Sequence, residues 1–263
     1  MSTGQTELRT ELRGGILTLT IEREEKRNSL SASLLRELIA AVTAASGNDE
    51  VRVIAIASAG ERVFCSGADL AVMSNDATGL EQHEGRGLLR DLVLAMRRCT
   101  KPVVACVQGL CLAGGFALAG GADVVLARES AQFGLPEVDR GLWPFMVGAL
   151  LSRHLSPKHA FDLMVTGERI TARQAYEIGF VSRVFADDEY AASVDGYLAK
   201  LAAAPPVAVR VGKAAWTAVG ETGSLEAALE AMQAQLSLIT TTKDAVEGIT
   251  AFFEKRPPQW TGR

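Results

Sequence analysis

The chain has 263 residues, of which 48% are hydrophobic and 22% are charged, and its formal net charge is −4. These values indicate a globular protein with a substantial core and argue against nucleic-acid binding, since no long basic run is present. A local basic patch that contacts phosphate groups is still compatible with them.

The start of the chain and its cysteines narrow the class of protein further. The opening MSTGQTELRT lacks the basic start and apolar core of a signal peptide, and no run of about 18 apolar residues predicts a membrane helix. Cys65, Cys99, Cys106 and Cys111 form no CxxC pair, and the chain has only three histidines. We therefore expect buried, reduced thiols rather than a zinc site, no membrane partner, and a cytoplasmic location.

The first half of the chain alternates between predicted strands and helices. Gly14-Gly15 is a hairpin signal, and short apolar runs such as 52–57 are typical of buried strands. Apolar residues at helical spacing, with Ser31 as the N-cap, predict the first long helix. In chain order we expect strands at 7–12 and 16–21, a helix at 32–46, a strand at 52–57, a loop at 58–70, a helix at 85–98, a strand at 103–107, a helix at 114–120 and a strand at 123–127.

After Pro144 the pattern becomes mostly helical, as in 224–238, where leucine and methionine recur at helical spacing. This arrangement predicts an α/β body followed by a C-terminal helical region. The expected helices are 147–153, 157–165, 172–178, 187–203, 206–218, 224–238 and 242–254.

Two loops rich in small residues, 65–70 (CSGADL) and 112–116 (LAGGF), are candidates for chemistry. Glycine at a strand-to-helix turn lets the backbone approach a ligand and leaves the first N–H groups of the helix free. Two such N–H groups that converge on one oxygen form an oxyanion hole, which suits a thioester whose carbonyl becomes an enolate. Each loop alone is equally compatible with an ordinary tight turn.

Two further segments carry candidate side chains. Glu137 follows a proline within the apolar stretch 131–138, where partial burial would raise its pKa and make it a better general base. It could also be a glutamate that only favours a helix N-terminus. The segment 251–257 (AFFEKRP) is either an amphipathic helix end or a site where basic side chains reach phosphate groups.

These segments occur together and in order, and on them the chain from about residue 7 to 263 resembles the crotonase (enoyl-CoA hydratase/isomerase) family. The resemblance implies an α/β fold with a ββα superhelix core. Residues 1–200 would form the core with a CoA-thioester site, and 201–263 a helical trimerisation region of a homotrimer or dimer of trimers. The segments that carry the resemblance are IEREEKRNSLS, VFCSGADL, VQGLCLAGGFAL, AQFGLPEVDRGLWP and AFFEKRPPQWTGR.

By motif position, the resemblance implies that the N–H groups of Ala68 and Gly114 form the oxyanion hole and that Glu137 is the general acid/base. The partner would be an acyl-CoA substrate, with CoA as part of the substrate and no metal or redox cofactor. The residues implied in substrate binding are Lys26, Arg27, Ser66, Ala68, Asp69, Leu70, Ala71, Gly114, Phe252 and Lys255.

The sequence departs from the hydratase pattern at Ala117, where hydratases of the family carry their first glutamate. Water addition normally uses two carboxylates, whereas one can move a proton between C2 and C4 of an enolate, so the sequence favours an isomerase. A hydratase with a substitute second acid, either Asp69 or Asp139, and a catalytically silent CoA-thioester binder are the alternatives. We expect Asp69 to brace its loop instead, and Asp139 to face solvent or pair with Arg140.

Three apolar residues, Trp143, Phe145 and Met146, follow the Glu137 segment. We expect them to line or flank the acyl pocket, although core packing or a contact between subunits would explain them equally well.

Overall fold

A computed structural model describes residues 6–69 and 78–263. The helices and strands, in chain order, are β1 (Leu8–Arg13), β2 (Ile16–Ile21), η1 (Glu24–Lys26), α1 (Ala32–Gly47), β3 (Val53–Ser58), β4 (Val63–Cys65), α2 (Gly79–Arg98), β5 (Val103–Val107), β6 (Leu110–Leu112), α3 (Gly114–Gly120), β7 (Val124–Arg128), β8 (Gln132–Gly134), η3 (Val138–Arg140), α4 (Phe145–His154), α5 (Pro157–Thr166), β9 (Arg169–Thr171), α6 (Ala172–Glu177), β10 (Arg183–Phe185), α7 (Tyr190–Ala202), α8 (Pro206–Val219), α9 (Leu225–Ile239) and α10 (Lys243–Glu254).

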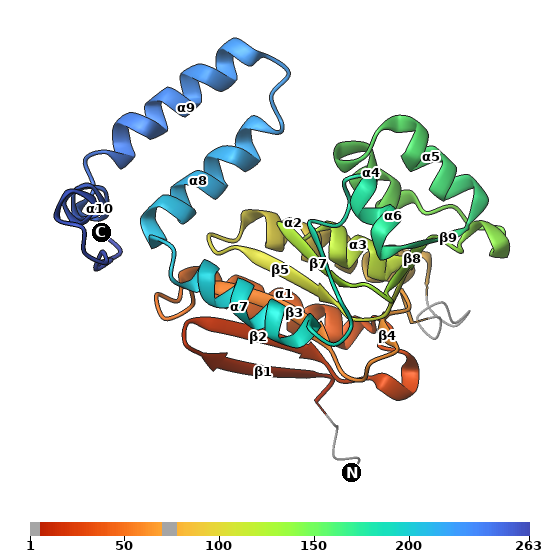
Figure 1. Ribbon diagram of the computed structural model, residues 1–263. Coiled ribbons are helices and arrows are strands. Elements are labelled where there is room, and N and C mark those ends of the chain that lie inside the picture. Colours follow the sequence, from red (N-terminus) through yellow and green to blue (C-terminus); the bar gives the residue numbers. More distant parts are fainter. Residues whose placement is uncertain (1–5, 70–77) are drawn as a thin grey trace.

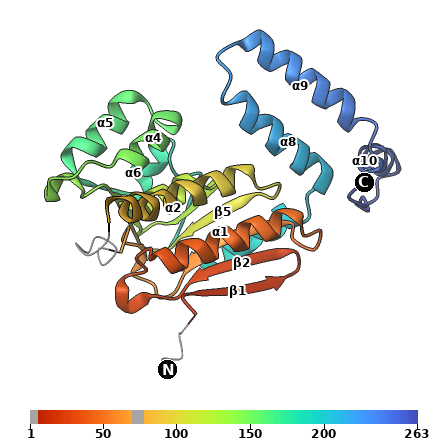
Figure 2. The same cartoon turned by 180° about the vertical axis from the view of Figure 1, so that it is seen from behind.

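The larger sheet has six strands in the order β1-β2-β3-β5-β7-β10, and every pair except the hairpin β1–β2 is parallel. Its central strands are buried on both faces, as parallel strands covered by helices must be. Helix α7 covers one face and α1 and α2 the other (Figures 1 and 2). Alternate residues of β3 therefore belong to different clusters, Ile54 and Ile56 on the α1/α2 side and Val53 and Ala55 on the α7 side.

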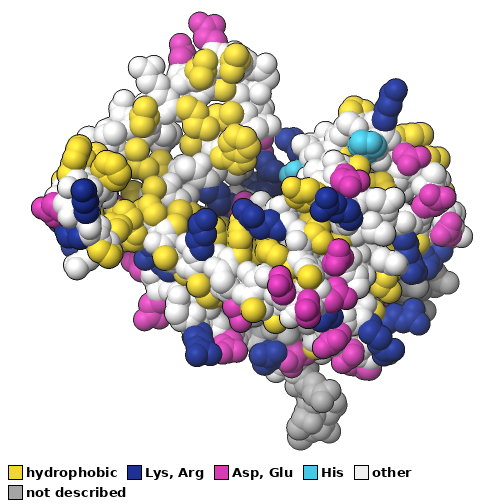
Figure 3. Space-filling view, in the orientation of Figure 1, with side chains coloured by type: hydrophobic (Ala, Val, Ile, Leu, Met, Phe, Trp, Pro, Cys, Tyr) yellow, Lys and Arg dark blue, Asp and Glu magenta, His cyan; other side chains and the backbone are white. Residues whose placement is uncertain are grey.

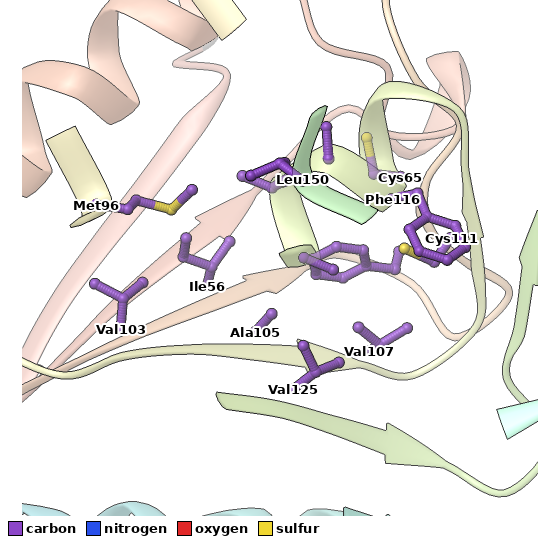
Figure 4. Packing of buried hydrophobic residues seen from close by; sticks show 14 of the residues in the cluster. Ile56, Cys65, Met96, Val103, Ala105, Val107, Cys111, Phe116, Val125 and Leu150 are labelled. Atoms are coloured by element: carbon purple, nitrogen blue, oxygen red, sulfur yellow. The ribbon is translucent and has the colours of Figure 1, made fainter. Parts of the chain in front are cut away.

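The main hydrophobic cluster lies on the α1/α2 side of this sheet and extends to α3 and α4. Figure 4 shows part of it, in which Ile56, Ala105 and Val125 from the large sheet and Leu150 from α4 point into the same space. Phe116 of α3 is fully buried and its ring centroid lies 5.8 Å from that of Phe133 of β8. This packing anchors α3 against the strands that carry the candidate loops.

A second sheet of four strands, in the order β4-β6-β8-β9, was not predicted. Each of its strands has only three residues, which is too short for an alternating pattern to be recognised. The prediction of a loop at 58–70 was therefore wrong for Val63–Cys65. The helix predicted from residue 85 was also placed too late, because Thr78 and Glu81 form a capping box that starts α2 at Gly79.

Helices α8 to α10 extend away from the rest of the molecule as an arm, which here means residues 206–263 (Figure 1). Lys213 fastens α8 to the body, because its Nζ donates to the carbonyl oxygens of Met96 and Lys101 at 2.9 Å and lies 2.6 Å from Oδ2 of Asp123. Hydrophobic side chains gather on the visible face of the arm (Figure 3). Leu229, for example, is 61% exposed.

Within residues 6–69 and 78–263, no helix is both long and apolar enough to cross a membrane. In the same part of the chain, no group of three or more His, Cys, Asp or Glu side chains could hold a metal ion. The four cysteines are buried and unpaired, and burial raises the pKa of Cys65 and of Cys106 to about 12. The thiols of Cys65 and Cys106 are therefore protonated and poorly reactive at neutral pH.

Candidate active site

Three candidate loops follow three adjacent parallel strands. In the small sheet β6 lies between β4 and β8, and both pairs are parallel. The carboxyl ends of the three strands therefore open onto the same edge, which is where ligands bind in parallel sheets. Ala68 follows β4, Gly114 follows β6 and Glu137 follows β8. The unpredicted sheet thus brings the three predicted catalytic positions to one side of the molecule.

The first two loops are in backbone contact. A Cβ atom placed on Gly114 would lie 3.2 Å from the backbone N of Ala68, and one placed on Gly67 would lie 3.1 Å from the backbone N of Gly114. Among the described residues, neither the Ala68 N–H nor the Gly114 N–H donates a backbone hydrogen bond. Two unengaged donors on touching loops form a site that can accept one oxyanion.

Ala113, which precedes α3, has an unusual backbone conformation, with φ 52° and ψ −121°. This region is strained for a residue with a Cβ atom and costs about 1–3 kcal/mol. The Ala113 N–H donates to the carbonyl oxygen of Gly134 at 3.0 Å, which ties the turn to β8. The strained turn sets the direction of the following peptide, whose N–H belongs to Gly114.

The first loop is also held by the segment before α1. Leu30 and Ala68 form an isolated parallel bridge, and the backbone N–H of Ser66 donates to the carbonyl oxygen of Arg27 at 3.2 Å. Lys26 and Arg27 are both exposed. The structure therefore brings the predicted CoA-contacting segment directly beside the predicted oxyanion loop.

Asp69 is engaged with Arg23, whose Nη2 lies 2.8 Å from the carboxylate Oδ2. The Arg23 side chain is 9% exposed and that of Asp69 is 19% exposed. This ion pair fits the bracing role expected for Asp69 better than the role of a second acid, because the carboxylate is engaged with Arg23.

Glu137 is half-buried, and its carboxylate Oε2 is buried without a hydrogen-bond partner among the described residues. Burial raises the pKa of Glu137 above its ordinary value of 4.5, while the backbone N–H of Glu137 and the charge of Arg140 oppose the rise. A desolvated carboxylate with one free oxygen is suited to accept a proton from a bound substrate.

No carboxylate stands at position 117, since Ala117 is fully buried within α3. Asp139 is exposed, as expected, whereas Arg140 donates through Nη1 to the carbonyl oxygen of Pro136. The described residues contain no ion pair between Asp139 and Arg140.

The apolar residues after Glu137 lie on the surface of this chain. Phe145 is 77% exposed and Met146 is 39% exposed, so core packing does not explain them. Trp143 is half-buried, with its ring centroid 6.0 Å from that of Phe161. A role at the rim of the acyl pocket and a role in contact between subunits both stay predictions.

Two further predicted residues, Phe252 and Lys255, are not brought to this edge. Phe252 is 78% exposed on α10, and Lys255 ends that helix. Figure 1 shows α10 at the opposite end of the molecule from β4 and β8. Leu70 and Ala71 lie outside the described residues.

Sequence reasoning missed Arg23 and the strain at Ala113. Arg23 stands among charged residues after a strand, so nothing in the local pattern distinguishes it from a surface arginine. The strain at Ala113 also leaves no signal, because alanine is not a residue that predicts a positive φ.

The family model described as enoyl-CoA hydratase/isomerase matches residues 11–263 of the chain. The chain is 35% identical over 252 residues to the 2,3-dehydroadipyl-CoA hydratase of Escherichia coli, covering 94% of this chain and 96% of that protein. It is 32% identical over 253 residues to the 1,2-epoxyphenylacetyl-CoA isomerase of the same species, covering 95% and 96%.

Solved structures agree with the sequence comparison. The crystal structure of an enoyl-CoA hydratase from Mycobacterium smegmatis superimposes with a TM-score of 0.93 at 31% identity and covers 97% of this chain and 99% of that one. The superposition confirms the predicted fold, an α/β protein with a crotonase-like ββα superhelix core.

Proposed function

Because the chain belongs to the enoyl-CoA hydratase/isomerase family, we propose that it isomerises enoyl-CoA thioesters, with Glu137 as its single general acid/base. The observation that carries the proposal is the contact between the loops of Ala68 and Gly114, together with the free carboxylate oxygen of Glu137 on the neighbouring loop. Proton transfer through an enolate needs only these groups, so we propose no metal or redox cofactor.

In this mechanism the thioester carbonyl oxygen accepts hydrogen bonds from the Ala68 and Gly114 N–H groups. Glu137 removes a proton from C2 of a 3-enoyl-CoA, and the negative charge moves to the carbonyl oxygen as the enolate forms. The same carboxyl then returns the proton to C4, so the double bond shifts to C2–C3. The raised pKa of Glu137 suits both steps, because the group must accept and then release a proton.

Isomerisation is favoured over hydration by position 117. An alanine methyl stands there, fully buried, and the two acids considered as substitutes are either paired with Arg23 or exposed. Water addition needs a group that positions the water as well as one that deprotonates it, whereas a shift between C2 and C4 needs one shuttle.

Hydration is the second candidate, because relatives of this chain bear hydratase names. The Escherichia coli relative is named for 2,3-dehydroadipyl-CoA hydration, and the Mycobacterium smegmatis structure is an enoyl-CoA hydratase. If this chain hydrates enoyl-CoA esters, a group other than residue 117 must orient the water.

The test compares wild-type turnover on 2-enoyl-CoA and 3-enoyl-CoA esters of several acyl types, with and without the substitution Ala117→Glu. We expect isomerisation by the wild-type protein, and faster water addition in the variant without an equal gain in isomerisation. Ala117→Gln is the matched control, because it adds similar bulk at this buried position without a carboxylate. Rapid hydration by the wild-type protein would favour the second candidate, and no turnover of any ester would favour a silent CoA-thioester binder.

We also propose that the chain assembles as a homotrimer or a dimer of trimers through 201–263. The exposed apolar side chains of the arm support this, as do Phe252 and Lys255, which lie far from the site of their own chain and would serve the site of a neighbouring copy.

A further inference from the structure

We propose that Arg23 is a positioning residue of the oxyanion hole, because its guanidinium fixes the loop that carries the Ala68 N–H. The inference rests on the proposed function, since it assigns Arg23 a role in stabilising the enolate. In this role Arg23 touches neither the thioester nor the reacting carbons and acts only through the loop of Ala68.

All three nitrogen atoms of the buried Arg23 guanidinium have partners. Nε lies 2.7 Å from Oε1 of Glu7, and Nη2 lies 2.8 Å from Oδ2 of Asp69. Nη1 donates to the carbonyl oxygen of Ser29 and, at 3.0 Å, to its Oγ. The guanidinium therefore joins three segments of the chain: the residue before β1, the residue before Leu30, and the end of the first oxyanion loop.

These contacts surround the bridge between Leu30 and Ala68. The Leu30 N–H donates to the carbonyl oxygen of Gly67 at 2.8 Å, and the Asp69 N–H donates to the carbonyl oxygen of Leu30 at 3.0 Å. Arg23 holds the bridge from both sides, since Ser29 precedes Leu30 and Asp69 follows Ala68.

The planar peptide between Gly67 and Ala68 explains why holding the bridge matters for catalysis. The carbonyl oxygen of Gly67 and the N–H of Ala68 belong to one trans peptide unit and point in opposite directions. Because Leu30 fixes the carbonyl oxygen, the N–H is directed away from Leu30 and toward the space beside Gly114. A loop that could rotate this peptide would lose one of the two oxyanion donors.

Arginine is suited to this role, because its planar fork binds several acceptors at fixed angles, which the single ammonium group of lysine cannot do. The fork is anchored to the start of α1, since the Ser31 Oγ donates to Oε2 of Glu7 and accepts from the Leu34 N–H at 3.0 Å. The Asp69 carboxylate thus connects the loop through Arg23 to a helix in the main core.

The test uses the full chain with Arg23→Met, Arg23→Lys and Asp69→Asn. We expect Arg23→Met to lower kcat by roughly 10- to 100-fold, less than deleting a donor, because the N–H is displaced but still present. KM for a 3-enoyl-CoA and affinity for free CoA should change less than about threefold, since ground-state contacts to the CoA arm stay. Arg23→Lys should restore part of the loss.

Two further measurements report on the conformation of the loop that carries Ala68. Bound cinnamoyl-CoA absorbs at longer wavelength when its carbonyl oxygen accepts hydrogen bonds, and this shift should shrink in Arg23→Met. Amide hydrogen exchange at Leu30 and Asp69 should become about tenfold faster, because both N–H groups lie in the bridge. The matched control is Arg9→Met, which removes an exposed arginine that pairs with Glu22, and all readouts should stay at wild-type values.

Wild-type kcat, spectral shift and exchange in a folded Arg23→Met variant would overturn the inference. If that variant does not fold, the same wild-type readouts in both Arg23→Lys and Asp69→Asn would overturn it. A wild-type protein that turns over no enoyl-CoA ester would defeat the proposed function instead, and exchange at Leu30 and Asp69 would still decide whether Arg23 fixes the loop.

Discussion

The body and the arm of this molecule use helices of similar length in opposite ways. Helix α1 has 16 residues and buries five apolar side chains against the large sheet. In the arm, α8 has 14 residues and α9 has 15, and each buries only one residue. Leu236 on α9 and Phe253 on α10 are 63% and 77% exposed.

The body therefore has a closed hydrophobic core within one chain, whereas the arm leaves most of its apolar side chains exposed. The body places two unengaged backbone N–H groups and a desolvated carboxylate at one edge of a small sheet, and strand pairing and backbone hydrogen bonds hold the loops that carry them. The arm presents a large apolar surface of the kind that monomeric proteins rarely expose. We therefore expect changes in the body to affect chemistry and changes in the arm to affect assembly.

The largest effect is expected from Glu137→Gln in the body. The amide cannot accept a proton, and positioned general bases contribute roughly 10²–10⁴-fold to turnover, so isomerisation should fall by about that factor. Steady-state kinetics on a 3-enoyl-CoA measures it, with assembly followed by sedimentation. Normal turnover in the variant would show that another group moves the proton.

The loss of turnover in Ala68→Pro should be nearly as large as that in Glu137→Gln. Proline removes the N–H that we propose as an oxyanion donor, and losing one such donor costs roughly 10²–10³-fold in kcat. Circular dichroism and sedimentation should show a folded protein of unchanged assembly. Full turnover in that folded protein would mean that the Ala68 N–H is not a donor.

In the arm, replacing Leu229 and Leu236 together by glutamate should dissociate the assembly without changing the fold of the body. Burying a leucine contributes about 1.5–3 kcal/mol, so two charged replacements should weaken association by at least roughly 100-fold. Analytical ultracentrifugation measures the shift. Leu80→Glu is the control, since Leu80 is 67% exposed on α2 in the body, and unchanged association in the double variant would remove α9 from the interface.

A smaller effect is expected for Lys255→Ala. An exposed ionic contact contributes about 0.2–1 kcal/mol, so affinity for CoA should fall by up to roughly fivefold while kcat stays nearly constant. Calorimetry with free CoA measures the affinity, and Lys158→Ala on α5 is the control. Equal affinities in the wild-type protein and the Lys255 variant would place Lys255 outside the CoA site.

The smallest effect concerns stability and pH. Burial raises the pKa of Glu137 above 4.5, so the carboxyl group binds its proton more tightly in the folded state than in the unfolded state. The stability that this proton binding adds is fully present below about pH 4.5 and is lost as pH rises through the folded-state pKa. The thermal midpoint of Glu137→Gln should therefore exceed that of the wild-type protein at neutral pH, and the difference should vanish in acid. Exposed Glu168→Gln is the control, and a difference independent of pH would contradict the assigned burial effect.

How far the sequence could predict the molecule depended on the length of each element. Long elements such as α1 and α9 repeat their apolar pattern over several turns, and β3 and β5 are continuous apolar runs, so all four were predicted. The three-residue strands of the small sheet have no period, and their pairing depends on contacts between distant residues.

The residues of the candidate site also fall into those that a local motif predicts and those whose role depends on distant contacts. Ala68, Gly114 and Glu137 were predicted because they lie in contiguous motifs, and the structure places them after three adjacent strands. The role of Arg23 depends on an ion pair across 46 residues, which no local pattern reveals. The position of the arm depends on the ion pair between Lys213 and Asp123, which are 90 residues apart in the sequence.

The contact between the two oxyanion loops also constrains how this sequence can evolve. A Cβ atom on Gly67 would lie 2.8 Å from the Cβ of Ala113, so the two positions share the space of one methyl group. Gly67→Ala should be rejected while Ala113 is present. Ala113→Gly would remove the overlap with the Ala113 Cβ, but not the 3.1 Å approach to the backbone N of Gly114 or the strain of φ +104° at residue 67. The two positions are therefore epistatic, and a substitution score that treats each one separately will misjudge both.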